Sequence, residues 1–177
     1  MMHERGHERV RERLQPSLIE RLTDDAPEQR SEAPGSQQAT LAQLRASVLR
    51  NLASLLNAVA HDADRWLDAY PEVRCSALNY GLPALAGRVA STIELRSLER
   101  ELRLAVLRFE PRLLSDSVRV SVLDDEPGAC GHNVIAFRIE AQLWAQPAPL
   151  AFSLHTRLDL ESGQCTVEEG QLARWPR

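Results

Sequence analysis

The amino-acid sequence predicts an α+β fold, with N-terminal helices packed on a mostly antiparallel β-sheet that carries C-terminal hairpins. Two changes of pattern lead to this prediction. Between residues 40 and 109, apolar residues recur at spacings of three and four, which is typical of helices buried on one face. After Pro111 the spacing becomes two, which is typical of strands. Helices followed by hairpin-rich strands favour a sheet with helices on one face.

The chain is expected to contain one domain with flanking segments. Its 177 residues are 44% hydrophobic, which is enough for one buried core. We expect a flexible arm over residues 1–39, a single α+β domain over residues 40–169 and a tail over residues 170–177. The arm contains a short amphipathic helix over residues 17–22, which is too short to be stable alone. It is expected to dock on a partner or to fold back on its own domain.

The first helix of the domain is predicted to begin at Thr40. Thr40 and Gln43 have the spacing of a capping box. The apolar pattern is lost at His61-Asp62, where the helix is expected to end. Its buried face is predicted to contain Leu41, Leu44, Val48, Leu52, Leu55 and Val59.

Two further helical segments and a loop are predicted before the sheet. A short turn is expected around Trp66 and Leu67. Residues 79–83 read Asn-Tyr-Gly-Leu-Pro, a loop motif in which Gly81 can take positive φ and Pro83 restricts the residue before it. Ser91 and Glu94 suggest a second capping box, for a helix from about Thr92 to Phe109. Its buried face is predicted to contain Leu95, Leu98, Leu102 and Val106.

Four strands are predicted in the second half of the chain. The first alternates valine with polar residues around Val118, Val120 and Val122. The second has apolar residues at every second position from Ile135 to Leu143, and the third alternates in the same way from Leu150 to Leu160, with Thr156 as the one polar member of the set. A turn at Ser162-Gly163 then leads into a short strand over residues 164–168.

Residues 109–112, Phe-Glu-Pro-Arg, form the predicted junction between helix and strand. Pro111 disfavours helical backbone at Glu110, so the helix should end by Phe109. Glu110 and Arg112 would then lie in extended chain with their side chains on the same side. Such a pair forms an internal salt bridge or makes a charge-assisted contact with a partner. On the residues alone the internal bridge is favoured, because most charge pairs in proteins are structural.

Composition argues against several classes of protein. The formal net charge of −4 provides no basic surface for nucleic acid. No apolar run reaches the roughly 18 residues of a membrane span, and the charged N-terminus lacks the apolar segment of a signal peptide. The three cysteines form no CxxC pair, so reduced thiols in a cytoplasmic protein are expected. They are Cys75, Cys130 and Cys165.

Catalysis has little support in the sequence. Glu110 and Asp116 are candidates for the paired carboxylates of a glycosidase, but nothing else marks a sugar-binding cleft. His61, His132 and His155 lie far apart and have no metal-ligand spacing, so neither a metal nor a cofactor is expected. The residues favour a protein that is not an enzyme.

Five segments, in the same order along the chain, resemble one protein family. Together they resemble the TssE family of the bacterial type VI secretion baseplate, which is related to the small wedge proteins of contractile phage tails. The resemblance covers about residues 17–168. The segments are Ser47-Val48-Leu49-Arg50-Asn51-Leu52 with Leu55-Leu56-Asn57, Tyr70-Pro71-Glu72-Val73, Ser76 through Pro83, Arg108 through Leu114, and Glu140-Ala141-Gln142-Leu143-Trp144. The Ala58-Val59 continuation and the acidic loop over residues 124–131 depart from the family pattern.

The resemblance implies a structural role with specific partners. The family's Glu-Pro-Arg motif falls on Glu110, Pro111 and Arg112, which are expected to bind a partner. A second, structural motif is expected at Asn79, Tyr80, Gly81 and Pro83. The implied partners are the TssF and TssG wedge subunits, with TssK, the spike and the TssB/TssC sheath nearby. The sheet half would help to start sheath assembly by strand addition at an exposed edge.

The resemblance also implies a place in the cell. The protein would act in the cytoplasm, at the membrane-docked baseplate, without inserting into the membrane. Three alternatives remain open at this point, of which a stand-alone regulatory binding module is one. The others are a phage or phage-like tail wedge protein and a cell-wall glycosidase, the latter in line with a lysozyme-like label that some family members carry.

Overall fold

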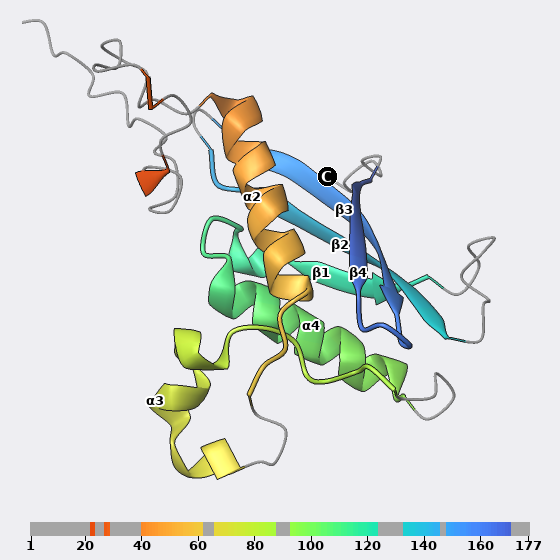
Figure 1. Cartoon of the computed structure of the whole chain (residues 1–177). Coiled ribbons are helices and arrows are strands. Elements are labelled where there is room, and N and C mark those ends of the chain that lie inside the picture. Colours follow the sequence, from red (N-terminus) through yellow and green to blue (C-terminus); the bar gives the residue numbers. More distant parts are fainter. Residues whose placement is uncertain are drawn as a thin grey trace, which may run out of the picture. The chain divides into compact units, whose positions relative to one another are not determined.

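The α+β class predicted from the sequence is confirmed by the computed structural model, which has helices followed by an antiparallel sheet (Figure 1). The structure describes residues 22–23, 27–28, 40–61, 66–87, 93–123, 133–145 and 148–170. It divides into two compact units, residues 1–47 and residues 48–177. The predicted helix over residues 17–22 and the tail after Gly170 lie outside the described residues, apart from Leu22.

Helix α2 spans Leu41–Leu56 and begins in the first unit. The predicted capping box at its start is confirmed. The Thr40 N–H donates to Gln43 Oε1 at 2.8 Å, and the Gln43 N–H donates to Thr40 Oγ1 at 3.2 Å. Leu41 is 43% exposed, so its predicted place on the buried face is wrong. It is the first residue of the helix, where fewer neighbours surround a side chain than in the middle.

The part of α2 in the second unit ends earlier than predicted. Val48, Leu52 and Leu55 are buried as predicted, and Leu56, which was not predicted, is buried as well. The helix stops at Leu56 because the next residues bond to a distant loop instead. Leu82 N–H donates to Ala58 O at 2.9 Å, and Ala60 N–H donates to Leu82 O at 2.7 Å. Val59, predicted to be buried on the helix, therefore lies in a bridge to Leu82 and is 69% exposed.

Three short helices follow along the chain. They are the 3-10 helix η1 (Trp66–Ala69), the α-helix α3 (Pro71–Arg74) and the 3-10 helix η2 (Ala77–Asn79). The predicted turn around Trp66 and Leu67 is confirmed as η1. Helix α3 was not predicted because four residues are too few to show a helical period. Its start is favoured by Pro71 in the first turn, where a missing N–H is tolerated.

Helix α4 spans Leu95–Phe109 and ends where the sequence predicted. Its start differs, because Glu94 is the N-cap residue and makes no side-chain cap bond. The capping box predicted at Ser91 and Glu94 is therefore wrong, and Ser91 itself lies outside the described residues. Leu95 is 36% exposed at the helix start. The buried face consists of Leu98, Leu102, Ala105 and Val106.

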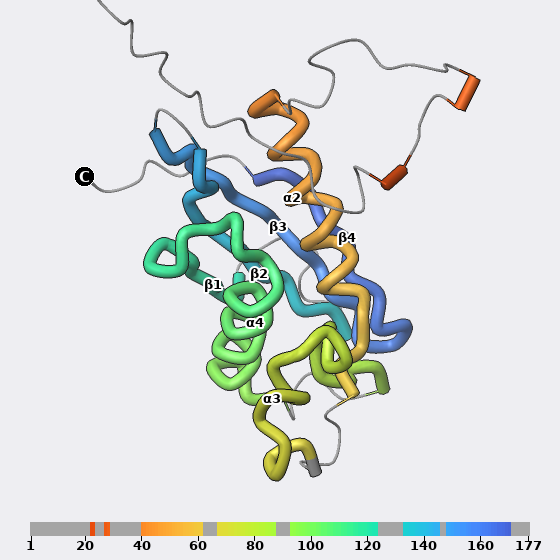
Figure 2. Tube along the Cα trace, turned by 90° about the vertical axis from the view of Figure 1, so that its left-hand side faces the viewer, coloured from red at the N-terminus to blue at the C-terminus, as the bar shows by residue number. Residues whose placement is uncertain are grey.

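The sheet of the second unit contains four described strands, β1 (Arg119–Val122), β2 (Val134–Leu143), β3 (Leu150–Asp159) and β4 (Cys165–Glu169). Each is antiparallel to the next, in the order β1-β2-β3-β4. The 3-10 helix η4 (Ser115–Ser117) precedes β1, and α4 lies beside β1 in both views (Figures 1 and 2). No described helix is long and apolar enough to cross a lipid bilayer.

One face of the sheet forms the core of the second unit. Because side chains alternate along a strand, the predicted period of two places the apolar residues together. Thr156 is the polar exception, and its hydroxyl donates to the Phe137 carbonyl at 2.9 Å. The other members are Ile135, Phe137, Ile139, Ala141 and Leu143 of β2, with Phe152, Leu154 and Leu158 of β3, all of them buried.

Helix α4 covers the β1 edge of this sheet with two charged side chains. The Val122 N–H donates to Glu99 Oε1 at 2.8 Å. Arg103 Nε donates to the Val118 carbonyl at 3.0 Å. An unpaired strand edge exposes backbone groups that other strands can join, and charged side chains are one way to block it. Helix and edge strand are therefore joined by hydrogen bonds as well as by packing.

The β4 edge is blocked at one residue by an asparagine side chain. Asn57 follows α2, and its Nδ2 donates to the Cys165 carbonyl at 2.9 Å. Its Oδ1 accepts from the Cys165 N–H, also at 2.9 Å. The amide of Asn57 thus occupies the position that one residue of an added strand would take. We refer to this arrangement as the Asn57 clamp.

Candidate functional site

The helix-to-strand junction is a tight turn. Glu110 follows α4, and its N–H donates to the Val106 carbonyl at 2.9 Å. Its own carbonyl accepts from the Leu113 N–H at 3.2 Å, three residues further on. Pro111 occupies the second position of this turn, where its fixed φ is favourable. The prediction of extended chain through Arg112 is therefore wrong, because the turn hydrogen bond closes the backbone there.

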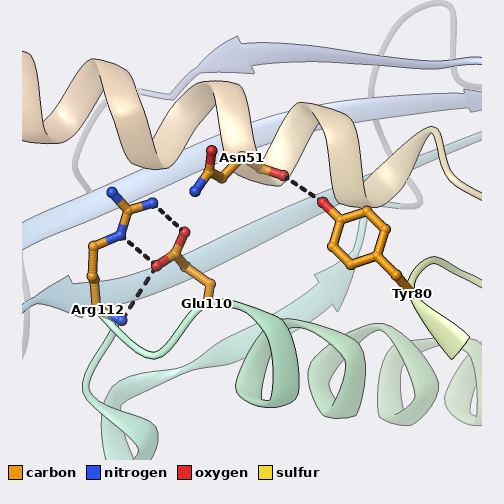
Figure 3. A network of polar contacts seen from close by, with 4 residues as sticks. All are labelled: Asn51, Tyr80, Glu110 and Arg112. Atoms are coloured by element: carbon orange, nitrogen blue, oxygen red, sulfur yellow. Dashed lines mark hydrogen bonds and ion pairs between the residues drawn. The ribbon is translucent and has the colours of Figure 1, made fainter. Parts of the chain in front are cut away.

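Glu110 and Arg112 pair with each other inside this turn (Figure 3). Arg112 Nε donates to Glu110 Oε1, and Arg112 Nη2 donates to Glu110 Oε2, both at 2.7 Å. The Arg112 N–H also donates to Oε1 at 3.2 Å. The Glu110 side chain is 2% exposed and that of Arg112 20% exposed. Both carboxylate oxygens are therefore bound, and the guanidinium is held in one orientation at the edge of the protein.

The turn is attached to the end of β2. The Trp144 N–H donates to the Arg112 carbonyl, and the Leu114 N–H donates to the Gln142 carbonyl, both at 2.8 Å. Leu113 and Leu143 form an antiparallel bridge between these two bonds. The Glu-Pro-Arg turn therefore continues the sheet, and Trp144 beside it is 46% exposed.

The second predicted motif, residues 79–83, lies against the same end of α4. The Tyr80 ring meets the Phe109 ring edge-on, with centroids 5.1 Å apart. Its hydroxyl donates to the Asn51 carbonyl of α2 at 3.3 Å (Figure 3). Gly81 has φ +125°, and Pro83 is exposed. The motif and the Glu-Pro-Arg turn are thus joined through Phe109, the residue before Glu110.

The loop that carries Tyr80 is held by a shared carbonyl. Asn79 is 5% exposed, and its Nδ2 donates to the Arg74 carbonyl at 3.2 Å. Arg108 Nη1 of α4 donates to the same carbonyl at 3.0 Å. Arg108 and Asn51 were not among the predicted site residues. Asn51 contributes only its backbone carbonyl to Tyr80, so its residue type carries no signal of that contact.

This geometry does not suit Glu110 for acid–base chemistry. An acid catalyst must reach a substrate proton, yet both oxygens of Glu110 are occupied by Arg112 and the side chain is buried. Asp116, the other proposed carboxylate, is exposed and lies in η4. Burial raises the pKa of the Cys165 thiol to about 12, so this thiol stays protonated and is a poor nucleophile. No group of three potential metal ligands occurs among the described residues.

The junction therefore joins two helices, a loop and a sheet into one rigid structural element, and its charged side chains neutralise each other. A junction of this kind fixes the positions of the elements that it joins, which is the role expected of a structural protein. Comparison with known protein families gives the particular family. The model for the baseplate wedge protein gp25 matches residues 42–148, and the chain belongs to this family.

The family match covers both predicted motifs and ends before β3. Membership makes the chain a component of a phage-like contractile baseplate, in which it contacts other baseplate subunits. Searches of curated proteins and of solved structures found no significant match.

Proposed function

We propose that the chain is the TssE-type wedge subunit of a type VI secretion baseplate, that it binds TssF and TssG, and that it acts in the cytoplasm at the membrane-docked baseplate. Membership of the wedge family supports this proposal, together with the ordered resemblance to TssE. The observation that carries a structural role is the bidentate Glu110–Arg112 pair, which fixes the junction without leaving a reactive group. A phage tail wedge protein shares this family and differs in its partners.

The proposal is tested by co-expressing the tagged chain with the TssF and TssG proteins of its own gene neighbourhood. We expect the wild-type chain to capture both proteins. Failure to capture either one, while the chain captures phage tail proteins encoded beside it, would assign the chain to a phage-like tail instead. An unrelated tagged protein of similar size and net charge serves as the control for non-specific capture.

We further propose that sheath assembly starts at the edge of β4 beyond the Asn57 clamp. The backbone groups of Cys165 face away from β3, because Asn57 binds both of them. The direction of the backbone N–H and C=O groups alternates along a strand. The backbone groups of Val167 therefore also point away from β3, whereas the backbone groups of Thr166 point toward Arg157 of β3. The β1 edge is bonded to α4 through Glu99 and Arg103, so the β4 edge is the more accessible of the two.

Proline at position 167 provides a selective test of this edge. Val167→Pro removes an N–H that faces away from β3, and edge positions of this kind tolerate proline. We expect its free energy of unfolding to change by less than about 1 kcal/mol, while sheath formation in cells, followed with a fluorescent TssB, is lost. The matched Thr166→Pro removes an N–H that faces β3 and should destabilise the fold by about 1–3 kcal/mol. Normal sheaths in cells carrying Val167→Pro would contradict the proposed edge.

A further inference from the structure

The side of α4 opposite its buried residues is composed mainly of arginine and leucine. At 100° per residue, the positions farthest from Leu98 and Leu102 are those that we call the outer face of α4. Its members are Arg96, Ser97, Arg100, Arg103, Leu104 and Leu107. Ser97 and Leu107 are half-buried, and the other four are exposed. The helix contains two carboxylates, Glu99 and Glu101, and both lie on the flanks of this face.

Among the described residues, most arginines on the outer face of α4 form no hydrogen bond or ion pair with another element of the fold. Arg96 lies in the first turn of α4, where the positive end of the helix dipole disfavours a cation. Within the described part of the chain it has no hydrogen-bond or ion-pair partner. Arg100 makes one bond, from Nη2 to Ser97 Oγ at 3.0 Å. Of the three arginines, Arg103 alone bonds to another element, through the Val118 carbonyl.

Leu104 adds an apolar contact to the same face. It is 48% exposed, whereas Leu98, Leu102, Ala105 and Val106 of the same helix are buried. Leu107 follows three residues later, so the two side chains are neighbours on the helix surface. Arginine is enriched in protein interfaces, whereas aspartate and glutamate are depleted there relative to the rest of the surface.

The charge of the face determines which partner fits it. The whole chain has a net charge of −4, whereas the outer face carries three arginines and no carboxylate. Two copies of the chain cannot pair through this face without bringing like charges together. Arg96 and Arg100 lie four residues apart, and carboxylates at the same spacing on a second helix would face both of them.

We propose that the outer face of α4 binds an acidic amphipathic helix of another subunit. Carboxylates of that helix meet Arg96 and Arg100, and its apolar side chains cover Leu104 and Leu107. The inference rests on the proposed function to the extent that the partner belongs to the same baseplate. The chemistry of the partner follows from the residues of α4 alone.

The test uses a photo-crosslinker beside the face in the full-length chain. p-Benzoylphenylalanine replaces Glu101 on the flank, in cells that express the chain with its own gene neighbourhood, and the crosslinked peptide is identified by mass spectrometry. We expect an adduct with an acidic helical segment. Arg100→Glu should reduce its yield by about tenfold or more, because a repulsive pair replaces an attractive one. Arg157→Glu, which makes the same charge change at an exposed position on β3, should leave the yield unchanged.

The crosslinking results test the proposed α4 interface independently of the proposed function. No adduct, a basic or non-helical adduct, or equal yields from Arg100→Glu and wild type would overturn it, even where TssF and TssG are captured normally. An acidic helix from a protein outside the baseplate would support the inference and contradict the proposed partners. Leu104→Gln tests the apolar half, and its thermal unfolding should match wild type while the adduct yield falls.

Discussion

Replacing Glu110 by alanine is expected to lower the free energy of unfolding by about 2–3 kcal/mol. Removing one member of a buried ion pair leaves the other charge without its partner, which is strongly unfavourable. The loss lies at the lower end of the usual range because Arg112 is 20% exposed and can reach water. The free energy is measured by chemical denaturation. Glu110→Gln, which keeps the shape and an acceptor oxygen, should lose about 1 kcal/mol.

The same variant separates the structural role of the Glu-Pro-Arg turn from a role in partner binding. We propose that Glu110→Ala remains folded at low temperature but no longer supports sheath assembly, because Arg112 loses the orientation that its partner requires. Asp116→Ala removes an exposed carboxylate nearby and should behave as wild type. A folded Glu110→Ala protein that assembles sheaths normally would limit Glu110 and Arg112 to an internal salt bridge.

Replacing Gly81 by alanine is expected to have the largest effect on stability, a loss of about 3 kcal/mol or more. Gly81 has φ +125°, and a Cβ atom there would lie 2.4 Å from the Ala58 carbonyl oxygen. That carbonyl is itself bonded to the Leu82 N–H, so it cannot move away without breaking this bond. The loop that carries Tyr80 should loosen with it, which is measured as faster amide exchange at Leu82.

Gly87 provides the matched control for this substitution. Its φ of +77° is also positive, but a Cβ atom there would meet nothing within 4 Å. Gly87→Ala should therefore cost about 1–2 kcal/mol, which is the backbone term alone. Equal losses at the two glycines would show that the contact with Ala58 contributes nothing.

The period of the apolar residues predicted most of the fold. The strands from Val134 to Asp159 follow from alternation alone, because side-chain facing along a strand is fixed by its geometry. Helix ends were less predictable. The early end of α2 depends on bonds between Ala58 and Leu82, which lie 24 residues apart, and no local pattern records them. The Asn57 clamp was even less predictable from local sequence, since its partner Cys165 is 108 residues away.

The candidate site was predicted in part. Glu110 and Arg112 were identified because proline beside two opposite charges is a local signal. Their pairing with each other was one of two alternatives, and it depends on the turn at Leu113. The contact between Tyr80 and Asn51 was beyond prediction, since a backbone carbonyl accepts the bond and any residue could supply it.

The two bonds between α4 and β1 have a mechanical consequence. Glu99 accepts from the backbone N–H of Val122 at the end of β1, and Arg103 donates to the carbonyl of Val118, the residue before the strand. A pull on α4 along the strand loads both bonds at once, so neither breaks before the other begins to bear force. Helix and strand would therefore move together as one unit when either of them is pulled, and the loops around them would deform first.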